Sequence, residues 1–197
     1  MVATVIYGPG TALVVVDVQN DFADPEGSLY VAGGQDVVPF ADEQVAAART
    51  TGAAIVYTQD WHPEHTPHFA KDGGIWPDHC IRDTWGAAFH PRLRVAGEIV
   101  QKGVDGADGY SGFSVRDPTS GDVAATALES ILRAASTERI VLCGLATDYC
   151  VVETALDARR LGFEVTALLA GIRAVDLQPG DGYRALARMR EAGAELV

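Results

Sequence analysis

The run of residues 12–18, Ala-Leu-Val-Val-Val-Asp-Val, constrains the fold more than any other part of the chain. Six of these seven residues are apolar, and four of them are valines, which favour extended backbone. A strand with one face in water would alternate apolar with polar residues, so this continuous run indicates a strand buried on both faces. Such strands belong to parallel sheets that helices cover on both sides.

Further apolar runs and helical patterns alternate along the rest of the chain. We expect strands at 53–58, 99–102, 139–143, 163–169 and 194–197, and helices at 122–135, 147–161 and 181–192. The helix at 147–161 is the best delimited, because Thr147 can cap it and Gly162 can end it. This alternation predicts the α/β class: a three-layer α/β/α fold with a doubly wound, mostly parallel six-stranded sheet. Because no linker or repeat interrupts the chain, we expect one domain over residues 1–197.

The charge balance argues against two classes of partner. Fifteen Lys and Arg face 27 Asp and Glu, and the formal net charge of −12 repels both phosphate backbones and anionic lipid. No apolar run reaches the roughly 20 residues that span a bilayer. The first ten residues lack a secretory signal, and three cysteines are too few for a disulfide framework. We therefore expect a cytoplasmic protein that binds neither nucleic acid nor membrane, and the residues leave open whether it forms a homo-oligomer.

Three polar or reactive residues stand where strands end, and this is the edge at which open α/β sheets bind ligands. Asp17 interrupts the first apolar run, where a buried carboxylate is costly without a partner. Cys150 falls in the first turn of the helix after 139–143, where free amides favour a thiolate. Lys102 ends the 99–102 run and is long enough to reach Asp17. In a 3-2-1-4-5-6 strand order the first and fourth strands lie about 5 Å apart, which would join Asp17 and Cys150 as base and nucleophile.

Each of these residues, taken singly, also has an ordinary structural interpretation. Asp17 could be a local cap, Cys150 a packing residue and Lys102 a surface residue. Cys143, inside a predicted strand, is expected to be a small core residue. The combination, rather than any one residue, indicates a catalytic site.

The histidines are concentrated in one part of the chain. Four of the five lie between residues 62 and 79, within the segment 61–95, which is too rich in Pro, Gly and polar residues to be core. Long loops in compact domains are often functional. Asp60 precedes these imidazoles, and oxygen and nitrogen ligands gathered by a turn suit a divalent metal ion. A structural metal site on a non-catalytic protein is an alternative, although such sites usually close their shell with four ligands, often cysteines.

Five parts of the chain, in the same order, resemble the nicotinamidase/pyrazinamidase branch of the isochorismatase-like hydrolases. They are VDVQNDF at 16–22 with GSL at 27–29, DWHP at 60–63, WPDHC at 76–80, KG at 102–103 with YSGF at 110–113, and GLATDYCV at 144–151. The resemblance runs from about residue 12 to the C-terminus and implies the isochorismatase-like hydrolase fold. It further implies an amidohydrolase that converts nicotinamide to nicotinate and ammonia and that also accepts pyrazinamide.

The resemblance assigns roles to the residues at the strand ends. Asp17 would be the general base, Lys102 would pair with it, and Cys150 would be the nucleophile that forms a thioester. The backbone N–H groups of Ala146 and Cys150 would form the oxyanion hole, beside a cis peptide bond between Leu145 and Ala146. No organic cofactor is implied.

The resemblance also implies one divalent metal ion, Zn, Fe or Mn, which orients the substrate ring. Its expected ligands are Asp60, His62 and His79, whereas His68 stands where the family carries Ser or His, so its role stays open. Outside this set, His65 is expected to be exposed or to lie beside the ligands, Cys80 to pack and His90 to lie on the surface. The pocket for the pyridine ring is expected to be bordered by Phe22, Leu29, Trp76, Tyr110 and Tyr149.

Two features depart from the family pattern. The segment after Lys102 is polar, with Asp105 and Asp108, where the family is more often aromatic, and Tyr149 precedes the nucleophile where His is common. A relative acting on another small amide, an N-carbamoyl or ureido compound, is the alternative enzyme; such relatives share the three catalytic residues and generally lack the metal ligands. Isochorismate, a vinyl ether, suits a cysteine nucleophile and a metal site less well.

Overall fold

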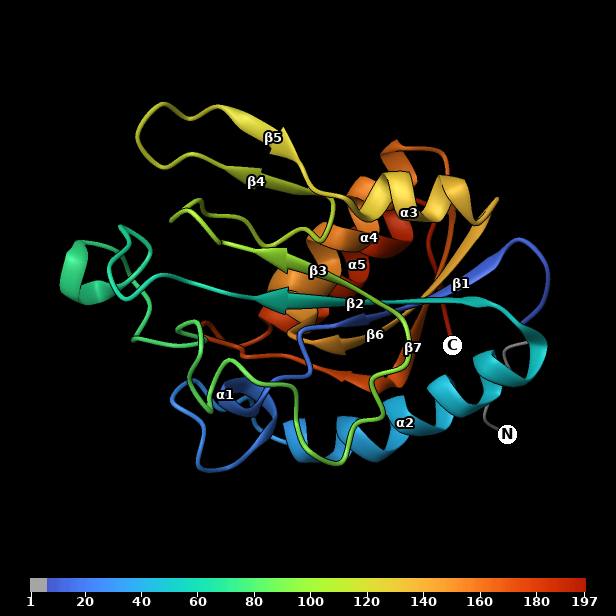
Figure 1. The fold of residues 1–197 in the computed structure, drawn as a ribbon, viewed down its shortest axis with the longest axis horizontal. Helices are drawn as coiled ribbons and strands as arrows, with labels where there is room; N and C mark the ends of the chain where they lie inside the picture. The colour runs from blue at the N-terminus through green and yellow to red at the C-terminus, as the bar shows by residue number, and fades with distance from the viewer. Residues whose placement is uncertain (1–6) are drawn as a thin grey trace.

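A six-stranded parallel sheet forms the centre of the molecule (Figure 1). The computed structural model describes residues 7–197, so residues 1–6, part of the segment in which we recognise no secretory signal, lie outside it. The strand order is β3-β2-β1-β6-β7-β8, and all neighbouring strands run parallel. The strands are β1 (Thr11–Val16), β2 (Ala54–Asp60), β3 (Glu98–Lys102), β6 (Arg139–Leu145), β7 (Glu164–Arg173) and β8 (Glu195–Leu196). The predicted α/β class is confirmed, and the observed order is the 3-2-1-4-5-6 order considered above, in which the first and fourth strands are neighbours.

Helices cover both faces of the sheet (Figure 1). The helical segments are α1 (Asn20–Ala23), α2 (Gly34–Thr51), the 3₁₀ turn η1 (Ala70–Asp72), α3 (Leu128–Ala134), the π-helical turn η2 (Thr147–Val151), α4 (Val152–Arg160) and α5 (Asp181–Glu191). Leu13 and Val15 of β1 join the apolar core on the α2 side, whereas Val14 and Val16 join the core on the side of α4 and α5. Because successive side chains of a strand point to opposite faces, one continuous apolar run fills both cores.

The long helix α2 is a feature that the sequence patterns above do not identify. Pro39 lies inside it, and proline normally ends or kinks a helix, which hides the helical signal. Its buried residues are mostly Val and Ala, among them Val38 and Ala41, which contrast little with their neighbours. Gly33 and Gly52 bound the helix in left-handed conformations with φ of 79° and 70°.

The helix predicted from residue 122 is wrong in its first part. Residues Val123–Ala125 form strand β5, which pairs antiparallel with β4 (Ser114–Arg116), and α3 begins only at Leu128. The two strands form a hairpin that projects beyond the sheet (Figure 1). Val123 is 60% exposed there, so the apolar spacing of this segment does not mark a buried helical face.

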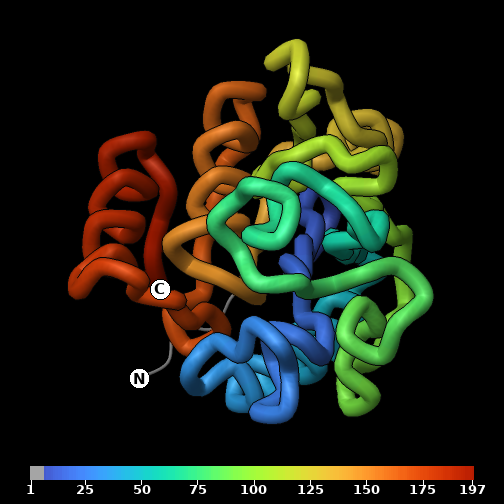
Figure 2. Tube along the Cα trace, turned by 90° about the vertical axis from the view of Figure 1, so that its left-hand side faces the viewer, coloured from blue at the N-terminus to red at the C-terminus, as the bar shows by residue number. Residues whose placement is uncertain are grey.

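The segment 61–95 is irregular, as expected, with one short 3₁₀ turn at Ala70–Asp72. Viewed from the end of the molecule, it crosses in front of the carboxyl ends of the central strands (Figure 2). The expectation that the segment contributes no core residues is wrong, since Phe69 and Cys80 are fully buried. His90, expected on the surface, is only 7% exposed and lies 3.8 Å from Asp24. These side chains are buried because the segment folds back over the sheet as a cover.

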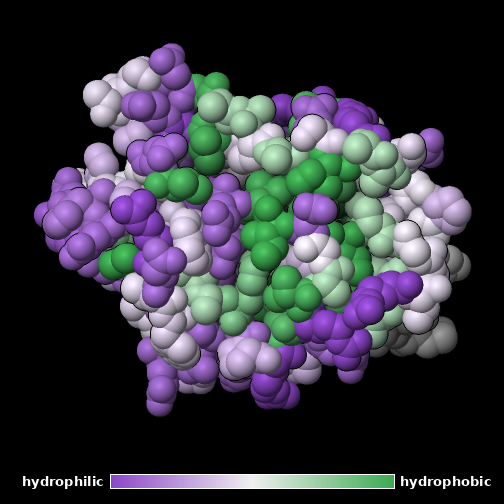
Figure 3. All heavy atoms as spheres, viewed as in Figure 1, coloured by the Kyte–Doolittle hydropathy of each residue, from purple (hydrophilic) through white to green (hydrophobic). Residues whose placement is uncertain are grey.

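On the face shown in Figure 3, hydrophobic side chains gather in the middle of the view, and the projecting hairpin is largely hydrophilic. The edge strand β3 contributes Ile99, which is 45% exposed. Among the helices of residues 7–197, none combines the length and apolar character that crossing a membrane requires.

Candidate active site

Four ionisable side chains meet where the central strands end. Asp17 follows β1, Asp60 and Lys102 end β2 and β3 as register partners, and Cys150 lies in the π-helical turn after β6. All four are at least 94% buried. The parallel order places these strand ends side by side, and this explains why residues so far apart in sequence meet.

Asp17 is held by two neighbours. Its backbone has a φ of 46°, which turns the chain sharply at the end of β1. The hydroxyl of Thr58 donates to its Oδ1 at 2.6 Å, and Lys102 Nζ lies 2.9 Å from its Oδ2. Burial raises the pKa of Asp17 even though the Lys102 ammonium opposes this shift. The carboxylate is therefore a better proton acceptor than an exposed aspartate.

Lys102 contacts every member of the cluster. Besides Asp17, its Nζ lies 2.8 Å from Asp60 Oδ1 and 3.4 Å from Cys150 Sγ. Burial alone would lower the pKa of this ammonium, but Asp17 and Asp60 outweigh it and raise the pKa well above the ordinary value. Lys102 thus stays charged between two carboxylates, and the interpretation of a surface lysine is wrong.

The two carboxylates that share Lys102 have opposite tendencies. Burial would raise the pKa of Asp60, but Lys102 and the neighbouring His62 hold it well below the usual range. The pKa of Asp17, by contrast, is raised. Environments that push two acidic groups apart in this way usually separate an acid–base group from one that stays ionised. Asp17 suits proton transfer, and Asp60 suits a lasting negative charge.

Cys150 sits in η2, and π-helical turns are often found at functional sites. Its thiol is 6% exposed, and burial followed by the charge of Asp17 raises its pKa well above the ordinary value, although Lys102 acts in the opposite direction. One carboxylate oxygen of Asp17, one of Asp60 and Sγ of Cys150 all lie within 4.8 Å of one another. A thiol of this kind is protonated at rest and needs an adjacent base to become a nucleophile. Asp17 is that adjacent base.

One expected feature of the backbone near Cys150 is present, the cis peptide bond between Leu145 and Ala146. Ala146 and Cys150 both line the cavity described below. The carbonyl of Ala146 accepts hydrogen bonds from Tyr149 and Val151 at 3.2 and 3.0 Å. Thr147, expected to cap the helix, makes no side-chain cap, because Ala146 occupies that position.

Three of the four clustered histidines come together. Side-chain nitrogens of His62, His68 and His79 lie within 4.8 Å of one another, and all three residues are buried. The rings of His62 and His68 stack with centroids 4.9 Å apart. His68, whose role the sequence left open, therefore joins the two histidines that were expected as ligands, whereas Asp60, the third expected ligand, groups with Asp17 and Cys150. His65 does not, since its side chain is 73% exposed and pairs with Asp72 at 3.2 Å.

The donor set of this imidazole cluster fits a divalent metal ion. Neither ring nitrogen of His62 has a hydrogen-bond partner. The carboxylate oxygen Oδ2 of Asp60 lies 3.8 Å from His62 Nε2. The Nδ1 of His79 lies 2.8 Å from the carbonyl of Pro77, which leaves Nε2 free. Burial lowers the pKa of His79 to about 4, so its imidazole is neutral, the form that binds metals. Buried, unpaired nitrogens beside an ionised carboxylate suit an ion such as Zn²⁺, Fe²⁺ or Mn²⁺.

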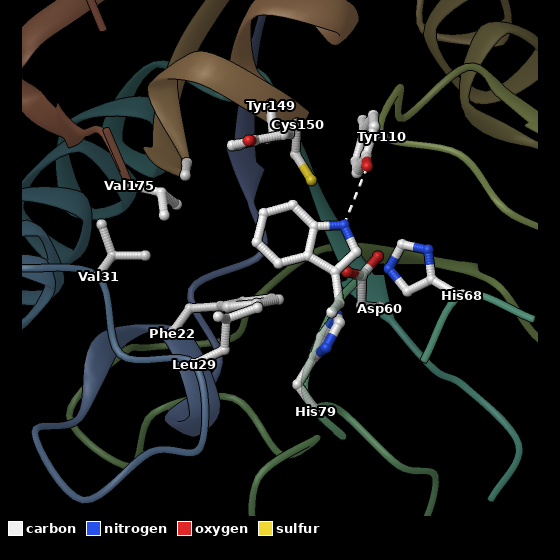
Figure 4. A pocket seen from close by; sticks show the side chains of 12 residues that line it. Phe22, Leu29, Val31, Asp60, His68, His79, Tyr110, Tyr149, Cys150 and Val175 are labelled. Atoms are coloured by element: carbon white, nitrogen blue, oxygen red, sulfur yellow. Dashed lines mark hydrogen bonds between the residues drawn. The ribbon is translucent and has the colours of Figure 1, made fainter. Parts of the chain in front are cut away.

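One cavity connects the Cys150 thiol with two of the three imidazoles, those of His68 and His79, whereas His62 does not line it. The cavity is narrow, with about 30 Å³ open to the centre of a water-sized sphere. Figure 4 shows Cys150, Tyr149 and Tyr110 on one side, Asp60, His68 and His79 on another, and Phe22 and Leu29 closing a third. All five residues expected to border the pocket line the cavity: Phe22, Leu29, Trp76, Tyr110 and Tyr149. The indole Nε1 of Trp76 donates to the Tyr110 hydroxyl at 3.0 Å, which ties two of these walls together.

Several residues of the site were not identified from the sequence. Val31 and Val175 line the cavity, but isolated valines carry no signal that separates them from core residues. Gln19 holds the backbone of Asp60, accepting from its N–H at 2.8 Å and donating to its carbonyl at 2.7 Å. Gln19 belongs to the VDVQNDF segment, so its position was marked, although its partner was not. Asp148 receives hydrogen bonds from two backbone N–H groups, those of Val175 and the residue after it.

Known proteins resemble this chain over almost its whole length. The model of the isochorismatase domain matches residues 11–197. The nicotinamidase of Escherichia coli (strain K12) is 35% identical, with 95% of this chain and 94% of that protein covered. The pyrazinamidase of Pyrococcus horikoshii, in complex with zinc, is 40% identical, with a TM-score of 0.85 over 96% of this chain and 99% of that one. PnC1 from L. infantum, in complex with nicotinate, is 33% identical, with a TM-score of 0.88 over 98% and 95%.

The two solved structures superpose on almost the whole chain, so they share its fold. The matches confirm the expectation of an amidohydrolase from this group. The chain belongs to the isochorismatase family, within which it is similar to nicotinamidases and pyrazinamidases.

Proposed function

We propose that this protein is a metal-dependent nicotinamidase, which hydrolyses nicotinamide to nicotinate and ammonia through a thioester on Cys150. The observation that carries the proposal is the shared cavity, in which the Cys150 thiol faces the same small space as Asp60 and the imidazoles of His68 and His79. A heteroaromatic amide has two ends that need different chemistry, and this cavity offers a different set of groups to each. The similar chain from L. infantum was solved with nicotinate.

In the first half-reaction Asp17 accepts the proton of the Cys150 thiol, and the thiolate attacks the carboxamide carbon. The contact of Lys102 with both groups, at 2.9 and 3.4 Å, stabilises the thiolate as the negative charge moves to sulfur. The backbone N–H groups of Ala146 and Cys150 stabilise the oxyanion of the tetrahedral intermediate. The C–N bond then breaks, and protonated Asp17 gives its proton to the departing nitrogen, which leaves as ammonia.

In the second half-reaction the acyl group is transferred from sulfur to water. Asp17, again a carboxylate, accepts a proton from the attacking water molecule, and the same N–H groups stabilise the second oxyanion. Breakage of the C–S bond releases nicotinic acid, which loses its proton to solvent and becomes nicotinate, and the Cys150 thiolate takes the proton back from Asp17. Cys150 and Asp17 return to their starting protonation states, and no cofactor is consumed.

Asp60, His62, His68 and His79 are the residues that would hold a divalent ion, Zn²⁺, Fe²⁺ or Mn²⁺. When bound, the ion would offer a Lewis-acid position to the ring nitrogen of the pyridine. The pyrazinamidase of Pyrococcus horikoshii was solved in complex with zinc. Trp76, Tyr110 and the other aromatic walls would enclose the flat ring, so that the carboxamide is placed at Cys150. The same walls suit pyrazinamide.

The test is ammonia release from nicotinamide by purified protein supplied with Zn²⁺, Fe²⁺ or Mn²⁺. Cys150→Ala should abolish the release, whereas Cys143→Ala should keep it, because Cys143 lies in the core outside the cavity. Denaturing mass spectrometry of a rapidly quenched reaction should show the nicotinoyl group on Cys150. Full activity of the Cys150→Ala variant would overturn the proposal. Faster, chelator-insensitive hydrolysis of an N-carbamoyl or ureido compound would favour the alternative enzyme.

A further inference from the structure

Asp108 contacts the imidazole cluster from outside the cavity. Its Oδ1 lies 2.8 Å from Nδ1 of His68, an ion-pair distance, although the two groups are not aligned as a hydrogen bond. The side chain of His68 is 6% exposed, whereas that of Asp108 is 39% exposed, so the aspartate reaches inwards from the surface. Asp108 is not a member of the group of imidazoles and belongs to the polar segment after Lys102.

The negative charge of Asp108 beside Nδ1 bears on which nitrogen of His68 carries the proton. A carboxylate at Nδ1 favours the tautomer with the proton on Nδ1, and this leaves the lone pair on Nε2. His79 is arranged in the same way, with Nδ1 2.8 Å from the carbonyl of Pro77. His62, in contrast, has no hydrogen-bond partner at either nitrogen. Figure 4 shows His68 and His79 approaching Asp60 from two sides.

The position of Asp108 is itself fixed by the projecting hairpin. Its backbone N–H donates to the carbonyl of Arg116 at 2.7 Å, and the Arg116 N–H donates back at 2.5 Å. Arg116 is the last residue of β4, so Asp108 is paired to the hairpin like a short additional strand. Thr66, two residues before His68, donates through its hydroxyl to the carbonyl of Gly106 at 3.2 Å. The loop that carries His68 and the loop that carries Asp108 are therefore tied together.

We propose that Asp108 is a positioning residue for the metal site: it holds His68 in the Nε2-facing orientation, and the β4–β5 hairpin is the support that keeps Asp108 in place. This inference rests on the proposed function, because it presumes that His68 binds the ion. Carboxylate partners of metal-binding histidines fix the ring and increase its basicity, and their loss typically weakens metal affinity by about 10–100-fold.

The test measures Zn²⁺ affinity of the full chain by competition with a chromophoric chelator, without substrate. We expect wild type to bind one ion and Asp108→Ala to bind it about 10–100-fold more weakly. Asp108→Asn should recover much of this loss, since its amide oxygen can still accept the Nδ1 proton. Asp105→Ala is the matched control, because Asp105 is exposed on the same loop, and its affinity should equal that of wild type.

A double-mutant cycle with His68→Ala separates positioning from a general structural effect. If Asp108 acts through His68, adding Asp108→Ala to His68→Ala should weaken Zn²⁺ binding no further. Saturating Zn²⁺ should also restore most of the kcat of Asp108→Ala. Equal affinity of wild type and Asp108→Ala, or an equal loss with and without His68, would overturn the inference while leaving the proposed reaction intact. Absence of Zn²⁺ binding by wild type would instead overturn the proposed metal site, and this inference with it.

Discussion

Replacing Lys102 by methionine removes an ammonium while keeping a side chain of similar length and volume. In the structure Nζ lies 2.9 Å from Asp17 and 2.8 Å from Asp60, and the lysine is 1% exposed. The variant would leave two buried carboxylates without their shared counter-charge. Breaking a buried ion pair in this way costs about 3–5 kcal/mol of the free energy of unfolding. At about 2–4 °C per kcal/mol for a chain of this size, Tm should fall by roughly 6–20 °C.

Urea unfolding of the metal-free protein, followed by circular dichroism, measures this loss, and its pH dependence tests the cause. Burial raises the pKa of Asp17 above its unfolded value, and removal of Lys102 raises it further. Below its unfolded pKa, about 3.9, such an acid is protonated in both states and does not affect stability. As pH rises from there through the raised folded pKa, the acid destabilises the folded protein more and more. The loss of stability should therefore be smaller at pH 5 than at pH 7.

Two controls separate this argument from a general effect of losing a lysine. Lys71→Met breaks an exposed pair with Asp78, at 2.6 Å, and should leave the stability unchanged within error. Replacing Asp17 and Asp60 by asparagine in the Lys102→Met background removes the unpaired charges and should recover much of the loss. The reasoning is refuted if Lys102→Met unfolds within about 1 kcal/mol of wild type, or if the triple variant is no more stable than Lys102→Met.

Three further predictions follow from the same geometry. The kcat/KM for nicotinamide should fall as pH drops through the raised pKa of Asp17, because a protonated Asp17 cannot accept the proton of Cys150; a profile that stays flat down to the ordinary carboxyl range would contradict this. Gly103→Ala should weaken Zn²⁺ binding, measured by chelator competition, because the added Cβ would lie 2.6 Å from His62 Nδ1. Gly106→Ala is the control, since Gly106 has nearly the same φ (+78° against +77°) but an added Cβ there would have no contact under 3.8 Å; equal losses of affinity in both variants would point to the backbone instead. Treatment with a strong chelator should remove ammonia release, and added Zn²⁺, Fe²⁺ or Mn²⁺ should restore it; activity that survives complete metal removal, shown by metal analysis of the same sample, would contradict a role for the ion.

The parallel sheet could be predicted because each of its strands is a short apolar run, a local property. Residues 12–18 alone indicated burial on both faces, and β1 does contribute to both apolar cores. The prediction was wrong at 122–127, where the helical spacing of Ala124 and Ala127 was not matched by burial. Helix α2 was not predicted, because Pro39 in its interior hides the helical signal. In both cases the tertiary environment outweighed the local pattern.

The site divides in the same way. Asp17, Lys102 and Cys150 stand at predicted strand ends or in the turn after one, so their chemistry and the sheet topology together indicated a common location. The placement of Lys102 between two carboxylates depends on the register of β2 and β3, in which Asp60 and Lys102 are partners. No local pattern encodes that register.

The sequence by itself determined the parallel sheet and the residue types that carry the chemistry, because burial and reactivity are properties of single residues and short runs. The tertiary structure alone decided that His68 joins His62 and His79, and that Asp108 reaches His68. The physical reason is that the segment 61–95 has no repeating pattern, so its path over the sheet depends on contacts between residues far apart in the chain. Orientation of a side chain within a few ångströms is set by those contacts.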